Sequence, residues 1–135
     1  MIVRPDYINK IKPFIGLEPV KVLTGLRRSG KSVMLQLIQN EISNQGIPKT
    51  NIISFNFENM NTPRTAETLH NEIIKRVSNL NGKIFLFFDE IQEVEDWEKC
   101  INSLRIEMNC DIYITGSNAK LLSRGAVNIF SWEIC

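Results

Sequence analysis

The chain has 135 residues, of which 43% are hydrophobic and 23% charged, as in an ordinary globular domain. Sixteen Lys and Arg residues against fifteen Asp and Glu give a net charge of +1, which offers no argument for nucleic acid or an anionic membrane as partner. Neither a membrane-span run nor a signal-peptide core is found, and the three cysteines lack metal-ligand spacing, so we expect a cytoplasmic protein without membrane contact.

Short apolar runs alternate with helical patterns in the first half of the chain. Residues 20–24 form a β-branched run that leads directly into a glycine-containing loop. From Lys31 the apolar residues recur at helical spacing as far as Asn44, and residues 51–57 alternate between apolar and polar. This half therefore predicts a strand, a helix and a second strand.

The second half continues the same alternation. Thr62 and Pro63 suit the N-cap and first turn of a helix that continues to about residue 80. Residues 83–89 hold five apolar residues in succession, as expected for a strand covered on both faces, and a helix over 97–108 and a strand over 111–115 follow. Such βαβ units predict an α/β fold, a three-layer sandwich with a mainly parallel sheet and helices on both faces.

The domain organisation follows from these elements. Residues 1–19 are expected to form a leading segment with a short helix, and residues 20–123 the core that holds the glycine-containing loop. Residues 124–135 read as a divergent tail without a lid. Within that tail, residues 126–132 could form a further strand.

The loop after the first strand matches a phosphate-binding P-loop. Its glycines, Gly25 and Gly30, allow close backbone approaches that a Cβ would obstruct. Backbone N–H groups and the helix dipole then attract phosphate, Lys31 reaches the β- and γ-phosphates, and the Ser32 hydroxyl coordinates magnesium. We expect ATP with Mg²⁺. The predicted nucleotide-binding residues are Gly25, Leu26, Arg27, Arg28, Ser29, Gly30, Lys31 and Ser32.

Three other side chains have competing interpretations. Arg27 and Arg28 occupy variable positions of the loop, where they could contact the nucleotide, a partner or solvent. We favour solvent or a partner because the backbone already binds phosphate. His70 falls on a polar helix face, which favours a solvated side chain over a catalytic one.

The acidic end of the strand over 83–89 supplies a second half of the site. Asp89 can hold the magnesium ion, usually through water, and Glu90 can orient or deprotonate an attacking water. Because the strand over 51–57 intervenes along the chain, the strands that lead to Lys31 and Asp89 need not be neighbours. An inserted strand between them, together with a glutamate beside the metal aspartate, favours ATP-hydrolysing motors over small-molecule kinases.

Polar residues also follow the strand over 111–115. If that strand lies beside the one ending in Asp89, Ser117 or Asn118 could reach the γ-phosphate or the lytic water. A Gly-Ser-Asn turn with local capping is the alternative. In the company of a P-loop and an acidic strand end, we favour the catalytic interpretation.

Taken together, these residues resemble the AAA+ ATPases, and among them the prokaryotic predicted ATPases that carry a C-terminal domain of unknown function. The resemblance covers about residues 2–123. It rests on Arg4-Pro5-Asp6-Tyr7, Thr24-Gly25-Leu26-Arg27-Arg28-Ser29-Gly30-Lys31-Ser32, Phe88-Asp89-Glu90-Ile91-Gln92 and Ile114-Thr115-Gly116-Ser117-Asn118-Ala119-Lys120-Leu121-Leu122.

The resemblance implies roles for individual residues. It makes Lys31 and Ser32 the phosphate and magnesium residues, Asp89 the Walker B aspartate and Glu90 the catalytic glutamate. Asn118 falls at the sensor position, with Ser117 as the neighbouring choice. Gln92 and Trp97 also match, and we assign them only packing or supporting roles.

The chain departs from the family's pattern after Ser123. The family continues through a final strand, a helical lid and a further domain, whereas this sequence stops at Cys135 and resembles a truncated product or a fragment. Its trans-acting and lid arginines are therefore not identifiable, and Arg124 is a weak candidate. We expect ATP binding with slow hydrolysis, because an arginine finger contributes orders of magnitude to the rate.

Several functions compete at this stage. The leading one is a magnesium-dependent ATPase, with other protein chains as partners through AAA+ assembly. The alternative is a nucleotide-binding module without productive turnover that acts through a partner. Phosphoryl transfer to a small acceptor lacks an acceptor pocket and an arginine-rich lid, and nucleic-acid binding lacks a basic, aromatic-studded strand.

Overall fold

The computed structural model describes residues 12–16, 20–24, 28–116 and 129–133; the side chains at positions 14, 24, 28, 29 and 129–133 are not described. Strands and helices alternate along it, as the sequence predicts. The elements are η1 (Lys12–Phe14), β1 (Val20–Thr24), α2 (Arg28–Asn44), η2 (Lys49–Asn51), β2 (Ile52–Asn56), α3 (Ala66–Val77), β3 (Ile84–Asp89), η3 (Ile91–Glu93), α4 (Trp97–Glu107), β4 (Cys110–Thr115) and β5 (Ile129–Glu133).

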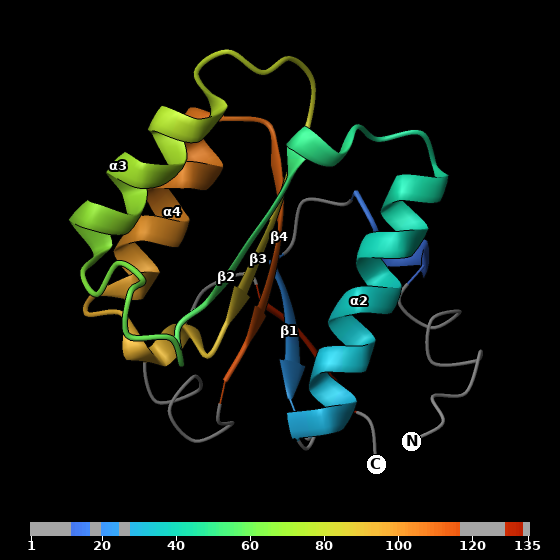
Figure 1. The fold of residues 1–135 in the computed structure, drawn as a ribbon, viewed down its shortest axis with the longest axis horizontal. Helices are drawn as coiled ribbons and strands as arrows, with labels where there is room; N and C mark the ends of the chain where they lie inside the picture. Colours follow the sequence, from blue (N-terminus) through green and yellow to red (C-terminus); the bar gives the residue numbers. More distant parts are fainter. Residues whose placement is uncertain (1–11, 17–19, 25–27, 117–128, 134–135) are drawn as a thin grey trace.

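The five strands form one parallel sheet in the order β2-β3-β4-β1-β5. The predicted parallel sheet is thereby confirmed (Figure 1). The strand between β1 and β3 is β4, while β2 lies beyond β3. The sequence left a strand within 126–132 as one possibility, and the structure places β5 at Ile129–Glu133, paired with β1. The boundaries of the tail as a domain stay a prediction.

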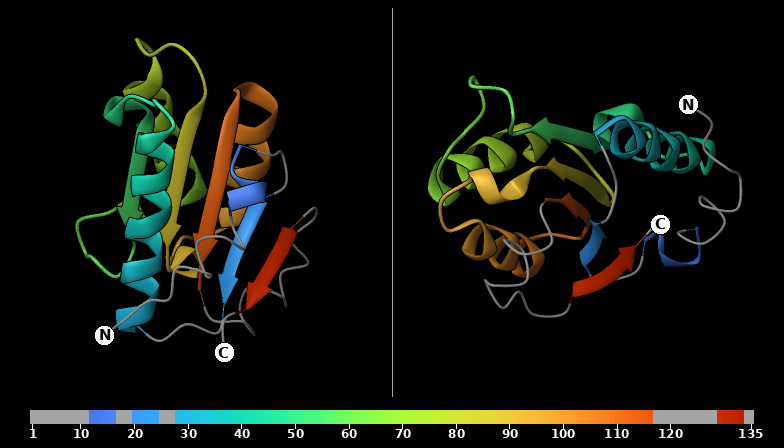
Figure 2. Two further views of the ribbon diagram at one scale, coloured as in Figure 1. Left: turned by 90° about the vertical axis from the view of Figure 1, so that its right-hand side faces the viewer. Right: turned by 90° about the horizontal axis from the view of Figure 1, so that it is seen from below.

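Helices cover both faces of the sheet, as predicted. Figure 1 shows α2 on one side of the strands and α3 with α4 on the other, and the view from below in Figure 2 shows the same layers. Side chains alternate across β3. Phe85 and Phe87 pack in the core that includes α2 residues, whereas Leu86 and Phe88 pack with α3 and α4 residues. All six residues of β3 are buried, because a central strand has helices over both faces.

The start of α3 differs from the prediction. The N-cap is Thr65 and not Thr62, since the Thr65 hydroxyl accepts the Thr68 N–H at 3.2 Å and the Thr68 hydroxyl accepts the Thr65 N–H at 3.3 Å. These reciprocal bonds form a capping box. The preceding chain is held in turns by Arg64, which donates to the Phe57 carbonyl at 2.7 Å. The helix therefore begins only after that anchor.

A buried polar cluster lies at the amino-terminal ends of β1 and β4. Asp111, which has no exposed surface, pairs with the Lys21 ammonium and accepts the Tyr113 hydroxyl at 2.6 Å and the Gly16 N–H at 2.8 Å. Burial lowers the pKa of Lys21 and outweighs the opposing effect of Asp111. The cluster ties the turn at Gly16 to the sheet, at the opposite strand ends from Asp89.

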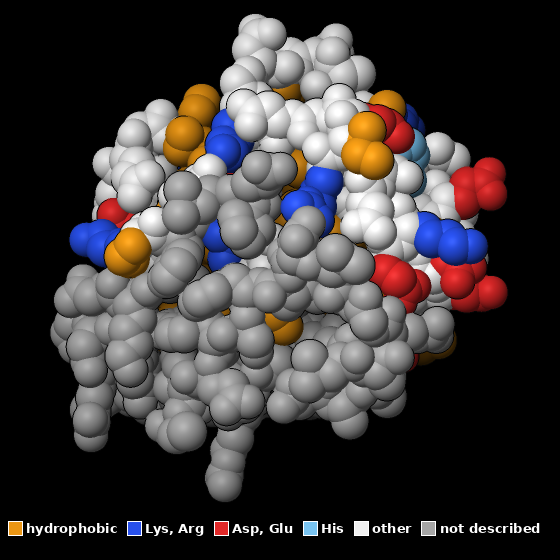
Figure 3. All heavy atoms as spheres, turned by 180° about the vertical axis from the view of Figure 1, so that it is seen from behind, with side chains coloured by type: hydrophobic (Ala, Val, Ile, Leu, Met, Phe, Trp, Pro, Cys, Tyr) orange, Lys and Arg blue, Asp and Glu red, His pale blue; other side chains and the backbone are white. Residues whose placement is uncertain are grey.

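The outer surface carries charges of both signs. On the face seen in Figure 3, the described Lys and Arg side chains are scattered and do not gather into one patch. Among the described residues, no helix combines the length and the apolar character needed to cross a membrane.

Candidate nucleotide-binding site

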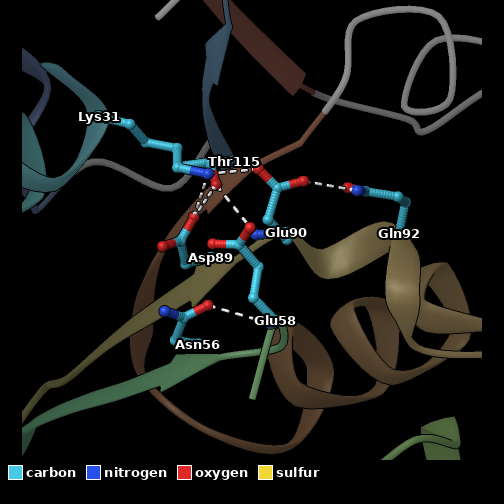
Figure 4. A network of polar contacts seen from close by, with 7 residues as sticks. All are labelled: Lys31, Asn56, Glu58, Asp89, Glu90, Gln92 and Thr115. Atoms are coloured by element: carbon cyan, nitrogen blue, oxygen red, sulfur yellow. Dashed lines mark hydrogen bonds and ion pairs between the residues drawn. The ribbon is translucent and has the colours of Figure 1, made fainter. Parts of the chain in front are cut away.

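Lys31, the predicted phosphate-binding lysine, lies in the first turn of α2, the helix that follows β1. β1 ends at Thr24 and α2 begins at Arg28, so the loop joins the carboxyl end of a strand to a helix N-terminus. In the first turn of α2, Gly30 is buried and Lys31 is only 6% exposed, while Ser32 is exposed. The Lys31 side chain extends from α2 toward the carboxyl ends of β3 and β4 (Figure 4).

Asp89 is the last residue of β3 and is 7% exposed. Its Oδ1 lies 3.1 Å from the Lys31 Nζ and accepts a hydrogen bond of 2.6 Å from the Thr115 hydroxyl. Its backbone carbonyl accepts the Phe57 N–H at 2.9 Å, just beyond β2. Three neighbouring strands and α2 thus fix the position of this carboxylate.

Glu90 has an unusual backbone conformation at the turn after β3. Its φ of 60° and ψ of 51° are left-handed, which costs a residue with a Cβ about 1–2 kcal/mol. Its N–H donates to the Thr115 hydroxyl at 3.0 Å, and its carboxylate contacts the Lys31 ammonium and accepts Gln92 Nε2 at 2.6 Å. Figure 4 shows these contacts converging from α2, β4 and η3. A strained backbone that several contacts hold in place is typical of functional sites.

Electrostatics in this cluster favour a charged lysine. Burial alone lowers the pKa of Lys31 and is the largest single effect, but the hydrogen bonds and charges of Glu90 and Asp89 together outweigh it. The net result is a pKa above the ordinary value for lysine. Lys31 therefore carries its positive charge throughout the physiological pH range.

The donor set suits a magnesium ion bound together with a triphosphate. Mg²⁺ prefers oxygen ligands and binds through one or two protein groups plus phosphate and water. Asp89 makes both of its side-chain contacts through Oδ1, and in the described part of the chain its Oδ2 has no partner. Ser32 offers an exposed hydroxyl one residue after Lys31. These groups fit the ion, and the Lys31 ammonium fits an anionic phosphate.

The structure thus brings Lys31, Asp89 and Glu90 together from two separate motifs. Arg28 and Ser29 are placed only by backbone, within the first turn of α2. The other predicted site residues lie outside the described residues, and their roles stay predictions: Gly25, Leu26, Arg27, Ser117 and Asn118.

Three further side chains can be compared with expectation. Trp97 is 2% exposed and belongs to the core between the sheet and its helices, which agrees with a packing role. Gln92 supports Glu90 directly through its hydrogen bond. His70 is not simply solvated, because it lies 3.0 Å from the Glu107 carboxylate of α4.

Thr115 is the site residue that sequence reasoning missed. It is completely buried at the end of β4 and contacts both acidic residues. The sequence motif pointed instead to the polar residues that follow Gly116. The strand register could have identified Thr115. Phe88 pairs with Ile114, so the next residues on the two strands, Asp89 and Thr115, are adjacent.

A parallel sheet in this order, with a P-loop lysine facing an acidic strand end, defines an AAA+ P-loop module of the nucleotide-binding ATPase type. The chain belongs to the AAA domain family, whose profile matches residues 17–131. The match includes the β1–α2 loop, Asp89, Glu90 and most of β5.

Two curated relatives resemble the chain. An uncharacterized protein of Haemophilus influenzae is 39% identical over 133 residues, which are 97% of this chain and 33% of that protein. An uncharacterized protein of Methanocaldococcus jannaschii is 37% identical over 105 residues, 78% of this chain and 22% of that protein. The chain therefore spans about a third or less of the curated relatives it matches.

A solved structure supports the fold. A chain in the structure of Drosophila ORC bound to AT-rich DNA and Cdc6 superimposes with a TM-score of 0.59 and 13% identity. The match covers 95% of this chain and 52% of that one. At this identity, the likeness shows that the two share a fold.

Proposed function

We propose that this chain binds ATP with magnesium and hydrolyses the bond between the β- and γ-phosphates. One observation carries the proposal: the Lys31 ammonium lies 3.1 Å from Asp89 and contacts Glu90 as well. A phosphate-binding cation, a candidate metal ligand and a candidate base from distant parts of the chain thus meet at one point.

Each residue has a distinct role in this proposal. Lys31 binds the β- and γ-phosphates, while Ser32 and Asp89 hold the magnesium ion. When bound, the ion neutralises charge on the phosphate oxygens. As a water oxygen bonds to the γ-phosphorus, the bond to the β–γ bridging oxygen breaks and Glu90 takes the proton from the water. Gln92 keeps the Glu90 carboxylate oriented.

The test combines calorimetric titration with Mg-ATP and an assay of phosphate release. We expect wild-type protein to bind and to release phosphate, Lys31→Ala to lose binding, and Glu90→Gln to bind without turnover. Lys49→Ala is the matched control, because Lys49 is exposed in η2 and belongs to no part of the site. Folded wild-type protein that gives no heat of binding would contradict the proposal.

Single-turnover measurements separate hydrolysis from binding alone. With enzyme in excess over ATP, a hydrolytic site converts its bound nucleotide to ADP and phosphate. Binding without conversion by the wild-type protein would leave a nucleotide-binding module that acts through a partner. The Glu90→Gln variant supplies the baseline for that comparison.

A further inference from the structure

Thr115 makes two hydrogen bonds with one hydroxyl, and each reaches a different acidic residue. The hydroxyl donates its proton to Asp89 Oδ1 at 2.6 Å and accepts the Glu90 N–H at 3.0 Å. A threonine hydroxyl has one donor and two acceptor lone pairs, so both bonds form together. The Thr115 side chain has no exposed surface, which excludes bulk water as a substitute for either partner.

We propose that Thr115 is a positioning residue for the hydrolytic step. This inference rests on the proposed function and adds to it a residue that acts through Asp89 and Glu90. Its hydroxyl fixes Oδ1 of Asp89 and holds the left-handed backbone of Glu90, and it thereby links the end of β4 to both carboxylates.

The geometry explains why the Thr115 hydroxyl alone can position both Asp89 and Glu90. The Glu90 N–H, the Thr115 hydroxyl and the Asp89 carboxylate form a chain of bonds in which each polarises the next. Threonine also restricts its own χ1, because it is branched at Cβ. At the left-handed turn the Thr115 hydroxyl is an acceptor for the Glu90 N–H beside a buried strand end.

If Thr115 had only a structural role, its substitution would change turnover no more than the loss of another buried hydroxyl. Strand β4 offers such a hydroxyl as a matched control. Tyr113 lies two residues earlier on β4, is fully buried, and donates its hydroxyl to Asp111 at the opposite end of the strand. Tyr113→Phe therefore removes a buried hydroxyl of the same strand without touching Asp89 or Glu90. If Thr115 served stability alone, Thr115→Val and Tyr113→Phe would affect turnover alike.

The test compares Thr115→Val, Thr115→Ser and Tyr113→Phe by steady-state phosphate release. We expect Thr115→Val to lower kcat by roughly 10- to 100-fold with KM changed by less than about threefold, because a misplaced general base affects the transition state more than substrate binding. Thr115→Ser should restore most of the rate, and Tyr113→Phe should leave it unchanged. Equal losses in the Val and Ser variants, or none in the Val variant, would overturn the proposal.

A second measurement does not depend on turnover, and its decisive arm uses the wild-type protein. Amide hydrogen exchange in the nucleotide-free wild-type protein should show the Glu90 N–H to be protected, and Thr115→Ser should retain that protection. Rapid exchange at Glu90 in folded wild-type protein would overturn the hydrogen bond and the proposal with it. Protection without any phosphate release would instead contradict the proposed hydrolysis while the contact between Thr115 and Glu90 stands.

Discussion

The contact between Lys31 and Glu90 predicts that a Glu90→Gln variant binds ATP more tightly than the wild-type protein. In the absence of nucleotide, the Lys31 ammonium is paired with Glu90 and with Asp89. Lys31 must leave Glu90 to bind a phosphate, so part of the binding free energy is used to break that pair. Glutamine keeps the shape and can still accept a hydrogen bond from the Lys31 ammonium, while the negative charge is removed.

The size of the effect follows from the contacts. The Lys31 ammonium remains charged in the variant, so what is lost is its attraction to the carboxylate charge, which contributes about 0.2–1 kcal/mol for an exposed ion pair. The Lys31 and Glu90 side chains are only 8% and 21% exposed, which places this ion pair at the upper end of that range, about 1 kcal/mol. Because 1.4 kcal/mol is about tenfold in affinity, we expect the Kd to fall about fivefold.

The assay is calorimetric titration with a non-hydrolysable Mg-ATP analogue, so that neither protein consumes the ligand during the measurement. Glu93→Gln is the matched control, since Glu93 is an exposed glutamate three residues further along, in η3. Its Kd should equal that of the wild type. A Glu90→Gln protein that folds normally but binds no more tightly would refute the reasoning that Lys31 is restrained by Glu90.

Three further predictions concern stability and reactivity. Lys21→Met should lower the free energy of unfolding in urea by about 3–5 kcal/mol, because it leaves the Asp111 carboxylate buried without its cation; a loss below about 1 kcal/mol would contradict this. Thr65→Ala should cost about 1 kcal/mol through loss of the N-cap, whereas Thr62→Ala should cost less, and equal losses would dispute the observed start of α3. Burial raises the pKa of Cys100 to about 12, with Glu107 adding to the shift, so iodoacetamide at pH 8 should label this thiol only after unfolding; labelling of the native protein at that site would show the thiol to be accessible.

The strands and helices were predictable because their patterns are local. The five apolar residues of β3 indicate a strand buried on both faces, and all six residues of β3 are buried in the structure. The first turn of α3 was not predictable in the same way, because both Thr62 and Thr65 suit an N-cap. The anchor at Arg64 decides between them, and its partners lie in a loop whose path depends on tertiary contacts.

The buried cluster at the other end of the sheet also escaped prediction. Lys21 lies within a β-branched run, and a buried lysine requires a partner of opposite charge. Its partner, Asp111, is 90 residues away in the chain, so no local pattern connects them. Only the pairing of Lys21 with Tyr113 across β1 and β4 brings the carboxylate within reach.

The same distinction explains which parts of the candidate site the sequence could predict. Residues expected to contact the nucleotide follow strands in short contiguous motifs, so the chain itself indicates Lys31, Asp89 and Glu90. Thr115 acts through neighbours that are joined to it only by the register of β3 and β4. When two neighbouring parallel strands end at the same height in the sheet, their last residues lie side by side. Once Asp89 is assigned to the end of β3, the last residue of β4 is therefore a candidate positioning residue. A hydroxyl at that position can bind the aspartate and the backbone of the following glutamate, which makes strand-end register a physical criterion for positioning residues.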